Sequence, residues 1–206
     1  VNKTETETYV TLYGLKDNEE YFNNLLNTKA HAYYNKAQVD EWIDNNAAYL
    51  DSDQRNAIVE YLCNDKKVNL LVGVAGAGKS AVIATLYQII KDFDKNDDVM
   101  ITSYVNKAVS NLKERILDYS YSDVGMRGFV SYSYKINFAN DNSDFLKTVN
   151  KTRFLIIDEC SIIASVHLKY INNIVKNMSE NVKILMVGDP MQIHPIESGY
   201  PFIRAC

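Results

Sequence analysis

Apolar and polar positions along the chain predict strands that alternate with helices. An apolar strand is expected at residues 66–73, and apolar residues at helical spacing follow it directly. The same order is repeated downstream, because residues 98–104 predict a strand and residues 106–119 a helix. Two more apolar strands are expected at residues 153–159 and 181–188, with a helix between them. Strands alternating with helices indicate an α/β fold built on a parallel sheet.

The N-terminal part of the chain has a different pattern and predicts a small, mostly helical extension. The opening segment TETETYVTLY alternates as a strand that Gly14 would end. Residues 21–26 and 39–43 have the spacing of two short amphipathic helices. We interpret residues 1–48 as an extension packed on a main domain at residues 49–206, with partner binding as the alternative role.

Residues 119–150 interrupt the strand and helix pattern with many Tyr, Ser and Asn residues. The stretch VSYSYKINF can alternate as a strand, so two interpretations stay open for this segment: an inserted hairpin, or an aromatic-rich loop packed on its own domain. Aromatic and basic residues mix here, as on surfaces that bind single-stranded nucleic acid: Arg127, Phe129, Tyr132, Tyr134 and Lys135.

The segment LLVGVAGAGKS places a glycine-rich turn between a predicted strand and the helix after it. It matches G-x-x-x-x-G-K-[ST], the phosphate-binding loop of nucleotide-binding proteins, although a flexible glycine turn is the alternative. Small residues at Gly76, Ala77 and Gly78 let backbone N–H groups approach a polyphosphate, and the next helix presents its positive end. Lys79 would bind the outer phosphates of ATP, and the Ser80 hydroxyl would bind the accompanying Mg²⁺.

Two other predicted strands also end in polar residues. The strand that begins at Arg153 is apolar until Asp158 and Glu159, although unpaired buried carboxylates are costly. Beside a phosphate loop, Asp158 would order the Mg²⁺ shell and Glu159 would polarise a water molecule, whereas helix capping by Asp158 is the structural alternative. Gln192 follows the strand at 181–188, where its amide would contact the terminal phosphate unless it is an ordinary loop residue.

Two further positions have both a structural and a functional interpretation. Gln54 stands three residues after Asp51, which predicts a capping box, whereas its amide also matches the donor and acceptor of an adenine edge. We favour adenine recognition because this helix comes just before the strand of the phosphate loop. Tyr104, Asn106 and Lys107 follow a strand end, where they would bind single-stranded nucleic acid or form a simple strand-to-helix loop.

Composition excludes several classes of protein. The net charge is −4, which argues against a broad basic face for duplex nucleic acid but not against a narrow basic groove. No apolar run approaches the ~20 residues of a membrane span, so we expect no membrane partner. Cys63, Cys160 and Cys206 are far apart, which favours reduced thiols in the cytoplasm or in a compartment that contains nucleic acid. The three histidines lack the spacing of zinc ligands.

Taken in order, these segments resemble the first RecA-like domain of a superfamily 1 helicase, nearest the RecD and Dda branch. DQRNAIVEYL is similar to the family's adenine-reading Q motif, GVAGAGKS to its P-loop and SYVNKAV to an element that lies along single-stranded nucleic acid. LIIDECS and VGDPMQIHPI resemble its Asp-Glu and Gly-Asp-x-x-Gln motifs. The resemblance covers residues 50–196 and implies a P-loop NTPase with a RecA-like parallel sheet. It also implies that the Gln192 strand lies between the strands of the P-loop and of Asp158.

The resemblance implies an activity as well. A domain of this family binds and hydrolyses ATP with Mg²⁺ and translocates on single-stranded nucleic acid, here DNA rather than RNA, in the 5′ to 3′ direction. By the same resemblance Gln54 reads adenine, and Gln192 couples the nucleotide to the nucleic acid. Tyr104, Asn106 and Lys107 line the path of the strand.

Two departures from the family pattern shape these expectations. VSYSYK lacks the histidine of a further family element, and the chain ends at Cys206 without the second RecA-like domain and its arginine finger. We therefore expect a fragment that binds nucleotide, hydrolyses it poorly and does not unwind alone. Two alternatives stay open: a stand-alone PhoH-like ATPase that works as an oligomer, and a non-catalytic, nucleotide-dependent binding module that acts through residues 1–48.

Overall fold

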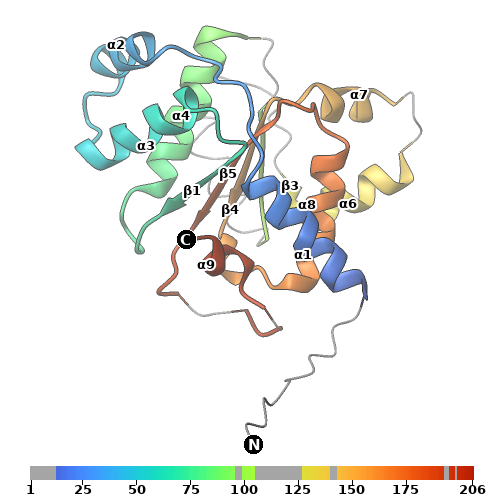
Figure 1. The fold of residues 1–206 in the computed structure, drawn as a ribbon. Helices are drawn as coiled ribbons and strands as arrows, with labels where there is room; N and C mark the ends of the chain where they lie inside the picture. The colour runs from blue at the N-terminus through green and yellow to red at the C-terminus, as the bar shows by residue number, and fades with distance from the viewer. Residues whose placement is uncertain (1–12, 96–98, 105–126, 140–142, 193–194, 198) are drawn as a thin grey trace, which may run out of the picture.

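Parallel strands form a single sheet with helices on both faces (Figure 1). The computed structural model describes residues 13–95, 99–104, 127–139, 143–192, 195–197 and 199–206. Across the sheet the strands are β1 (Val68–Val72), β5 (Lys183–Gly188), β4 (Phe154–Asp158), β2 (Val99–Ser103) and β3 (Arg127–Gly128). This is the predicted α/β architecture, and β5 lies between β1 and β4 as the resemblance to helicases implied.

The central strands are buried on both faces, which is why they appear in the sequence as continuous apolar runs. Successive side chains of a strand point to opposite faces of the sheet. Phe154 and Ile156 of β4 accordingly belong to one hydrophobic core, whereas Leu155 and Ile157 belong to the core on the other face. The sheet therefore separates two apolar layers, each covered by helices.

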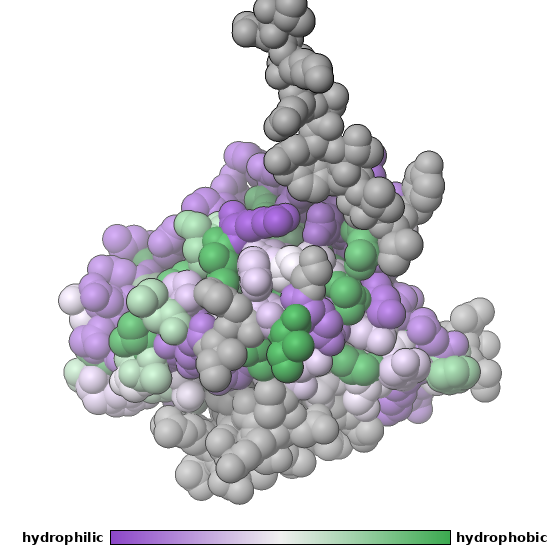
Figure 2. All heavy atoms as spheres, turned by 90° about the horizontal axis from the view of Figure 1, so that it is seen from below, coloured by the Kyte–Doolittle hydropathy of each residue, from purple (hydrophilic) through white to green (hydrophobic). Residues whose placement is uncertain are grey.

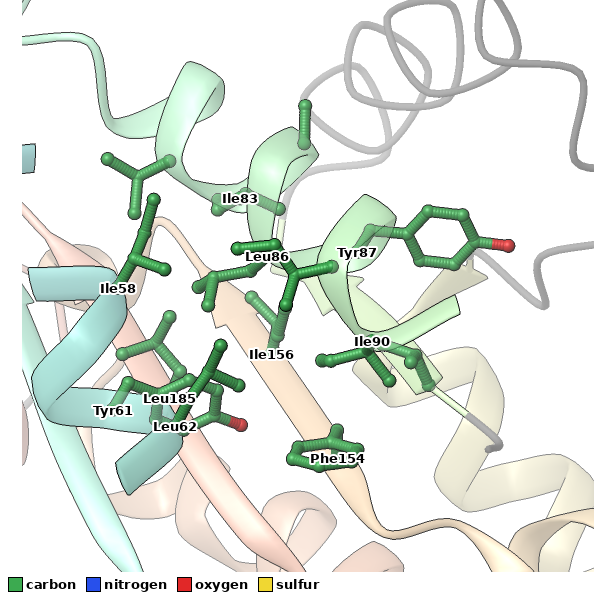
Figure 3. Close-up of a cluster of buried hydrophobic side chains, with 14 of the residues drawn as sticks. Ile58, Tyr61, Leu62, Ile83, Leu86, Tyr87, Ile90, Phe154, Ile156 and Leu185 are labelled. Atoms are coloured by element: carbon green, nitrogen blue, oxygen red, sulfur yellow. The ribbon is translucent and has the colours of Figure 1, made fainter. Parts of the chain in front are cut away.

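The first layer lies under α2 (Lys36–Asn46), α3 (Ser52–Cys63) and α4 (Lys79–Phe93). Figure 3 shows Leu86 and Ile90 of α4 pointing toward Ile156 of the sheet, with Ile58 of α3 beside them. All four of these side chains are fully buried. The helix predicted after the phosphate loop thus packs its apolar stripe against the strand that carries Asp158.

In the part of the chain that the structure describes, the second layer lies under helices and short 3₁₀ turns on the opposite face. They are α1 (Tyr13–Leu26), α6 (Phe129–Phe138), α7 (Asp144–Lys151), α8 (Leu168–Lys176), η1 (Cys160–Ile162) and η2 (Ser165–His167). The short α9 (Pro201–Ala205) adds Phe202 to this layer. Among the described residues no helix is long and apolar enough to cross a membrane.

The described part of the N-terminal extension is packed on both faces of the sheet. On one face α1 is joined to α8, because the Asn172 side-chain amide donates to the Asn18 carbonyl at 2.9 Å. On the other face the Tyr33 and Tyr34 rings lie 4.9 and 6.1 Å from the Phe154 ring, measured between centroids. The helices predicted around residues 21–26 and 39–43 are both present, as α1 and α2.

One predicted strand is wrong, because VSYSYKINF forms the helix α6. Val130, Tyr134 and Ile136 alternate as in a strand, but Ser133 and Ile136, three residues apart, are the buried positions among the residues of this segment whose side chains are described. Asn173 of α8 donates to the Ser133 hydroxyl at 3.0 Å, so this face of α6 packs against α8. The described part of the predicted hairpin is therefore β3 followed by two helices.

Gly14 lies inside α1 and does not end an element there, contrary to the prediction. The strand predicted before it lies outside the described residues, apart from Tyr13, which begins α1. The helix predicted at residues 106–119 also lies outside them.

Lys183, the first residue of β5, has an ammonium group that is buried at the amino ends of the strands. Its Nζ donates to the main-chain carbonyl of Asn64 at 2.6 Å and to the Asn64 side-chain oxygen at 2.9 Å. Burial lowers the pKa of Lys183 to about 8, because the charged form loses hydration. Asn64 is the C-cap of α3, so these bonds fasten the end of that helix to β5.

This buried lysine predicts a pH dependence of stability. From about pH 8 to about pH 10 the unfolded chain keeps the Lys183 proton that the folded chain has released. Rising pH in this window should therefore stabilise the wild type relative to Lys183→Met, by up to ~1.4 kcal/mol per pH unit. Urea unfolding of both proteins at several pH values measures this difference, and a difference that stays constant with pH would contradict the assignment.

Candidate nucleotide-binding site

The predicted site residues lie where the parallel strands end. The loop after β1 carries Lys79, β4 ends in Asp158, and the turn after β5 carries Gln192. Because β1, β5 and β4 are neighbours, these three exits lie at the same edge of the sheet, where α/β proteins bind ligands. The strands end toward the lower side of Figure 1, and Figure 2 shows apolar and hydrophilic residues intermixed on that side.

The loop between β1 and α4 needs glycine at two positions. Gly76 and Gly78 have φ values of +84° and +77°, in the left-handed region that side chains disfavour. A Cβ on Gly78 would also overlap the amide nitrogen of Gln54. The loop is fixed at its start, because the Gly73 N–H donates to the Gly188 carbonyl at the end of β5 at 3.2 Å.

Lys79 begins α4 and folds back over the loop that precedes it. Its ammonium group donates to the carbonyls of Gly73 at 2.6 Å and Val74 at 3.0 Å. The positive charge of Lys79 therefore lies beside the turn, at the N-terminus of α4, where the helix dipole also favours anions. Ser80 follows in the first turn of α4 and is partly exposed.

Gln54 forms the predicted capping box and also contacts the phosphate loop. Asp51 accepts a hydrogen bond from the Gln54 N–H at 2.8 Å, and the Gln54 side-chain oxygen accepts one from the Asp51 N–H at 3.2 Å. This is the predicted capping box at the start of α3. The Gln54 amide nitrogen also donates to the Ala77 carbonyl at 3.3 Å. Adenine recognition by Gln54 stays a prediction, and the Gln54 amide lies against the phosphate loop.

Asp158 is the last residue of the buried strand β4, and Glu159 follows it directly. Asp158 is 7% exposed, and burial raises its pKa to about 6, while the Glu159 N–H that it accepts at 2.9 Å opposes the shift. The charge of Lys79 also lowers the pKa of Asp158, which brings the two groups into one electrostatic site. Glu159 has φ of +56°, the one positive value at a non-glycine position among the described residues.

The turn after β5 is tied to the segment after β4. Asp189 is buried; its carboxylate accepts from the Met191 N–H at 2.9 Å, and its carbonyl accepts from the Gln192 N–H at 3.1 Å. The Asp189 N–H in turn donates to the Ser161 hydroxyl at 3.3 Å. Sequence reasoning gave no role to Ser161 or Asp189, because the bond between them joins segments that are 28 residues apart in the chain.

The predicted nucleic-acid residues are only partly described. Tyr104 follows β2, and its ring centroid lies 4.7 Å from that of His167. Asn106 and Lys107 lie outside the described residues. His167 was missed by sequence reasoning, which considered the histidines only as metal ligands.

The residues around Asp158 fit Mg²⁺ only together with phosphate oxygens. Among the described residues no three His, Cys, Asp or Glu side chains gather as a metal-binding group. Mg²⁺ is commonly held by one or two protein oxygens plus substrate phosphates and water. A buried carboxylate whose pKa is raised by burial, with a phosphate loop next to it, suits that arrangement.

The chain is similar in sequence and in fold to several known proteins. A profile of the AAA domain family matches residues 49–205. The chain is 26% identical over 231 residues to an uncharacterized protein of Methanocaldococcus jannaschii, covering 98% of this chain and 19% of that protein. It is 25% identical over 173 residues to the RecBCD enzyme subunit RecD of Buchnera aphidicola, covering 75% and 27%.

A similar fold occurs in a solved structure of Pif1 helicase from Candida albicans. The TM-score is 0.54 at 23% sequence identity, over 75% of this chain and 36% of that one, and this likeness shows the fold alone. The chain therefore spans between 19% and 36% of the length of these three proteins.

The positive φ of Gly78 predicts that alanine destabilises the protein at this position, in contrast to alanine at a glycine position within a helix. Gly78→Ala should lower the free energy of unfolding by about 1–2 kcal/mol, because alanine is strained at φ of +77° and its Cβ would displace Gln54. The matched control is Gly14→Ala in α1, where nothing lies within 4 Å of the added Cβ and helix propensity favours alanine. Thermal and urea unfolding measure both changes, and equal destabilisation by the two variants would contradict the loop geometry.

Proposed function

The chain belongs to the AAA domain family, and we propose that residues 49–205 are the ATP-binding and ATP-hydrolysing motor domain of a helicase that translocates on single-stranded nucleic acid. The family match, the relative named RecD and the fold shared with Pif1 confirm the recognition of a RecA-like domain of the superfamily 1 helicases. The observation that carries the proposal is the convergence of Lys79, Asp158 and Gln192 at one edge of the sheet.

In the proposed nucleotide site each residue has a chemical role. The backbone of Gly76, Ala77 and Gly78 surrounds the phosphates, and the ammonium group of Lys79 neutralises their charge. Ser80 and Asp158 would hold Mg²⁺, which supplies charge stabilisation to the phosphates when it is bound.

Hydrolysis needs a base and a group that responds to the terminal phosphate. Glu159 takes a proton from the attacking water, whose oxygen forms a bond to the terminal phosphorus while the bond to ADP breaks. Gln192 lies on the turn after β5, the strand next to β1 and its phosphate loop, and its amide is assigned to the terminal phosphate. The adenine edge is assigned to Gln54, whose amide already lies against Ala77.

Nucleic acid is assigned to the exits of the neighbouring strands. Tyr104 lies at the carboxyl end of β2, next to the strand that carries Asp158, and Asn106 and Lys107 follow it in the sequence. Single-stranded DNA is proposed over RNA, with movement from 5′ to 3′, because the motifs resemble the RecD branch. Unwinding is proposed for the whole protein, since the chain spans only part of its relatives.

The proposal predicts separate losses of binding and of chemistry. Lys79→Ala should abolish tight binding of an ATP analogue, because the charge that faces the phosphates is removed. Glu159→Gln should keep that binding but lower single-turnover ATP hydrolysis, measured with oligo(dT) present, by at least ~100-fold. Glutamine differs little from glutamate in backbone preference, so the positive φ of this position does not confound the comparison.

A matched control for the charge change is Glu41→Gln on the exposed surface of α2. It should leave both binding and hydrolysis unchanged. Hydrolysis by Glu159→Gln at the rate of the wild type would contradict the assignment of the base, and unchanged analogue binding by Lys79→Ala would contradict the nucleotide site itself.

A further inference from the structure

Three consecutive strand exits meet at His167. Tyr104 follows β2, His167 lies in η2 after β4, and Glu197 lies in the segment after β5. The Tyr104 hydroxyl is 3.3 Å from His167 Nε2, and a Glu197 carboxylate oxygen is 3.9 Å from the same nitrogen. His167 is 7% exposed, so this buried ring, which follows β4, lies between groups that follow β2 and β5, the strands on either side of β4.

The hydrogen bond that Nδ1 of His167 accepts determines which ring nitrogen carries the proton. The Ala164 N–H donates to His167 Nδ1 at 3.2 Å, so the proton of the neutral ring is on Nε2. Burial lowers the pKa of His167, with Lys169 acting in the same direction and Glu197 against it, which favours this neutral ring at pH 7. Nε2–H is then the donor that faces the Tyr104 hydroxyl oxygen.

The segment that carries His167 is also packed tightly against the segment after Gln192. Gly199 has φ of +89°, and a Cβ at that position would overlap the Ser165 side chain. Ser165 is 5% exposed, and its hydroxyl has no hydrogen-bond partner among the described residues, so close packing and not hydrogen bonding joins these segments. A displacement of either segment is therefore transmitted to the other.

We propose that His167 is a positioning residue that holds Tyr104 in the orientation in which it contacts single-stranded nucleic acid. The same residue links Tyr104 to the segment that begins at Glu159 and, through Glu197, to the segment that carries Gln192. This inference rests on the proposed function, because it assigns a helper to the nucleic-acid contact. His167 lies in no motif recognised in the sequence.

A double-mutant cycle tests the proposal. Tyr104→Phe removes the hydroxyl and keeps the ring, and His167→Phe removes the donor and keeps an aromatic side chain of similar shape. Each variant of the 206-residue chain should bind fluorescent oligo(dT) about 3- to 10-fold more weakly at one fixed low salt concentration, the scale of one neutral hydrogen bond. The double variant should be no weaker than the single ones, because both changes remove the same interaction.

Rescue and controls separate positioning from general damage to the fold. His167→Gln retains an N–H donor near the Nε2 position and should recover most of the oligo(dT) affinity. Affinity for an ATP analogue should stay within about twofold of the wild type in all these variants, since one hydrogen bond remote from the phosphate loop is changed. His31→Phe is a matched control at an exposed position and should leave oligo(dT) binding unchanged.

The outcomes distinguish this inference from the function on which it rests. Additive losses, or no loss in His167→Phe while the wild type binds oligo(dT), would overturn the positioning role and leave the proposed function intact. A wild-type chain that binds an ATP analogue but no oligo(dT) would overturn the nucleic-acid part of the proposed function, and the positioning role with it.

Discussion

The hydrogen-bond ladders between the parallel strands hold every chemical group of the site in place. Val72 and Gly188, the last residues of β1 and β5, are register partners. Ser103 and Asp158, the last residues of β2 and β4, are register partners as well. Neighbouring strands therefore end level with each other, so a loop after one strand meets the loop after the next. A shift in register would separate the phosphate loop from the acidic strand end.

The site concentrates unfavourable local features that the two hydrophobic layers must offset. Asp158 is a carboxylate in a buried position, and Glu159 has a backbone conformation that costs free energy for a non-glycine residue. Gly188 faces a different constraint, because a Cβ there would lie 2.6 Å from the Phe202 ring. Such features persist when the surrounding core over-determines them, and here they occur at the strand ends and not in the layers themselves.

Much of the fold and of the nucleotide site could be predicted because the relevant signals are local in sequence. Strands β4 and β5 are short apolar runs, and the phosphate loop is a contiguous motif in which Gly76 and Gly78 have positive φ values. Gln54 shows the limit of such reasoning, because one side chain makes both the capping box and a contact to the loop.

The remaining features depend on contacts that sequence spacing does not record. Helix α6 was predicted as a strand, because a short segment of alternating apolar residues also fits helical spacing until its packing against α8 is known. His167 and Ser161 carry no motif, and the partners that join them to other strand exits, Tyr104 and Asp189, lie at least 28 residues away in the chain.

The central claim is that ATP binds at the strand ends with Mg²⁺ held between its phosphates and Asp158. Calorimetric titration of the chain with an ATP analogue, with and without Mg²⁺, tests that claim for the wild type and for Asp158→Asn. The account predicts that Mg²⁺ strengthens binding to the wild type, and that Asp158→Asn loses this gain while keeping its Mg²⁺-free affinity. An equal Mg²⁺-dependent gain in both proteins would contradict it, as would a wild-type chain that binds no nucleotide.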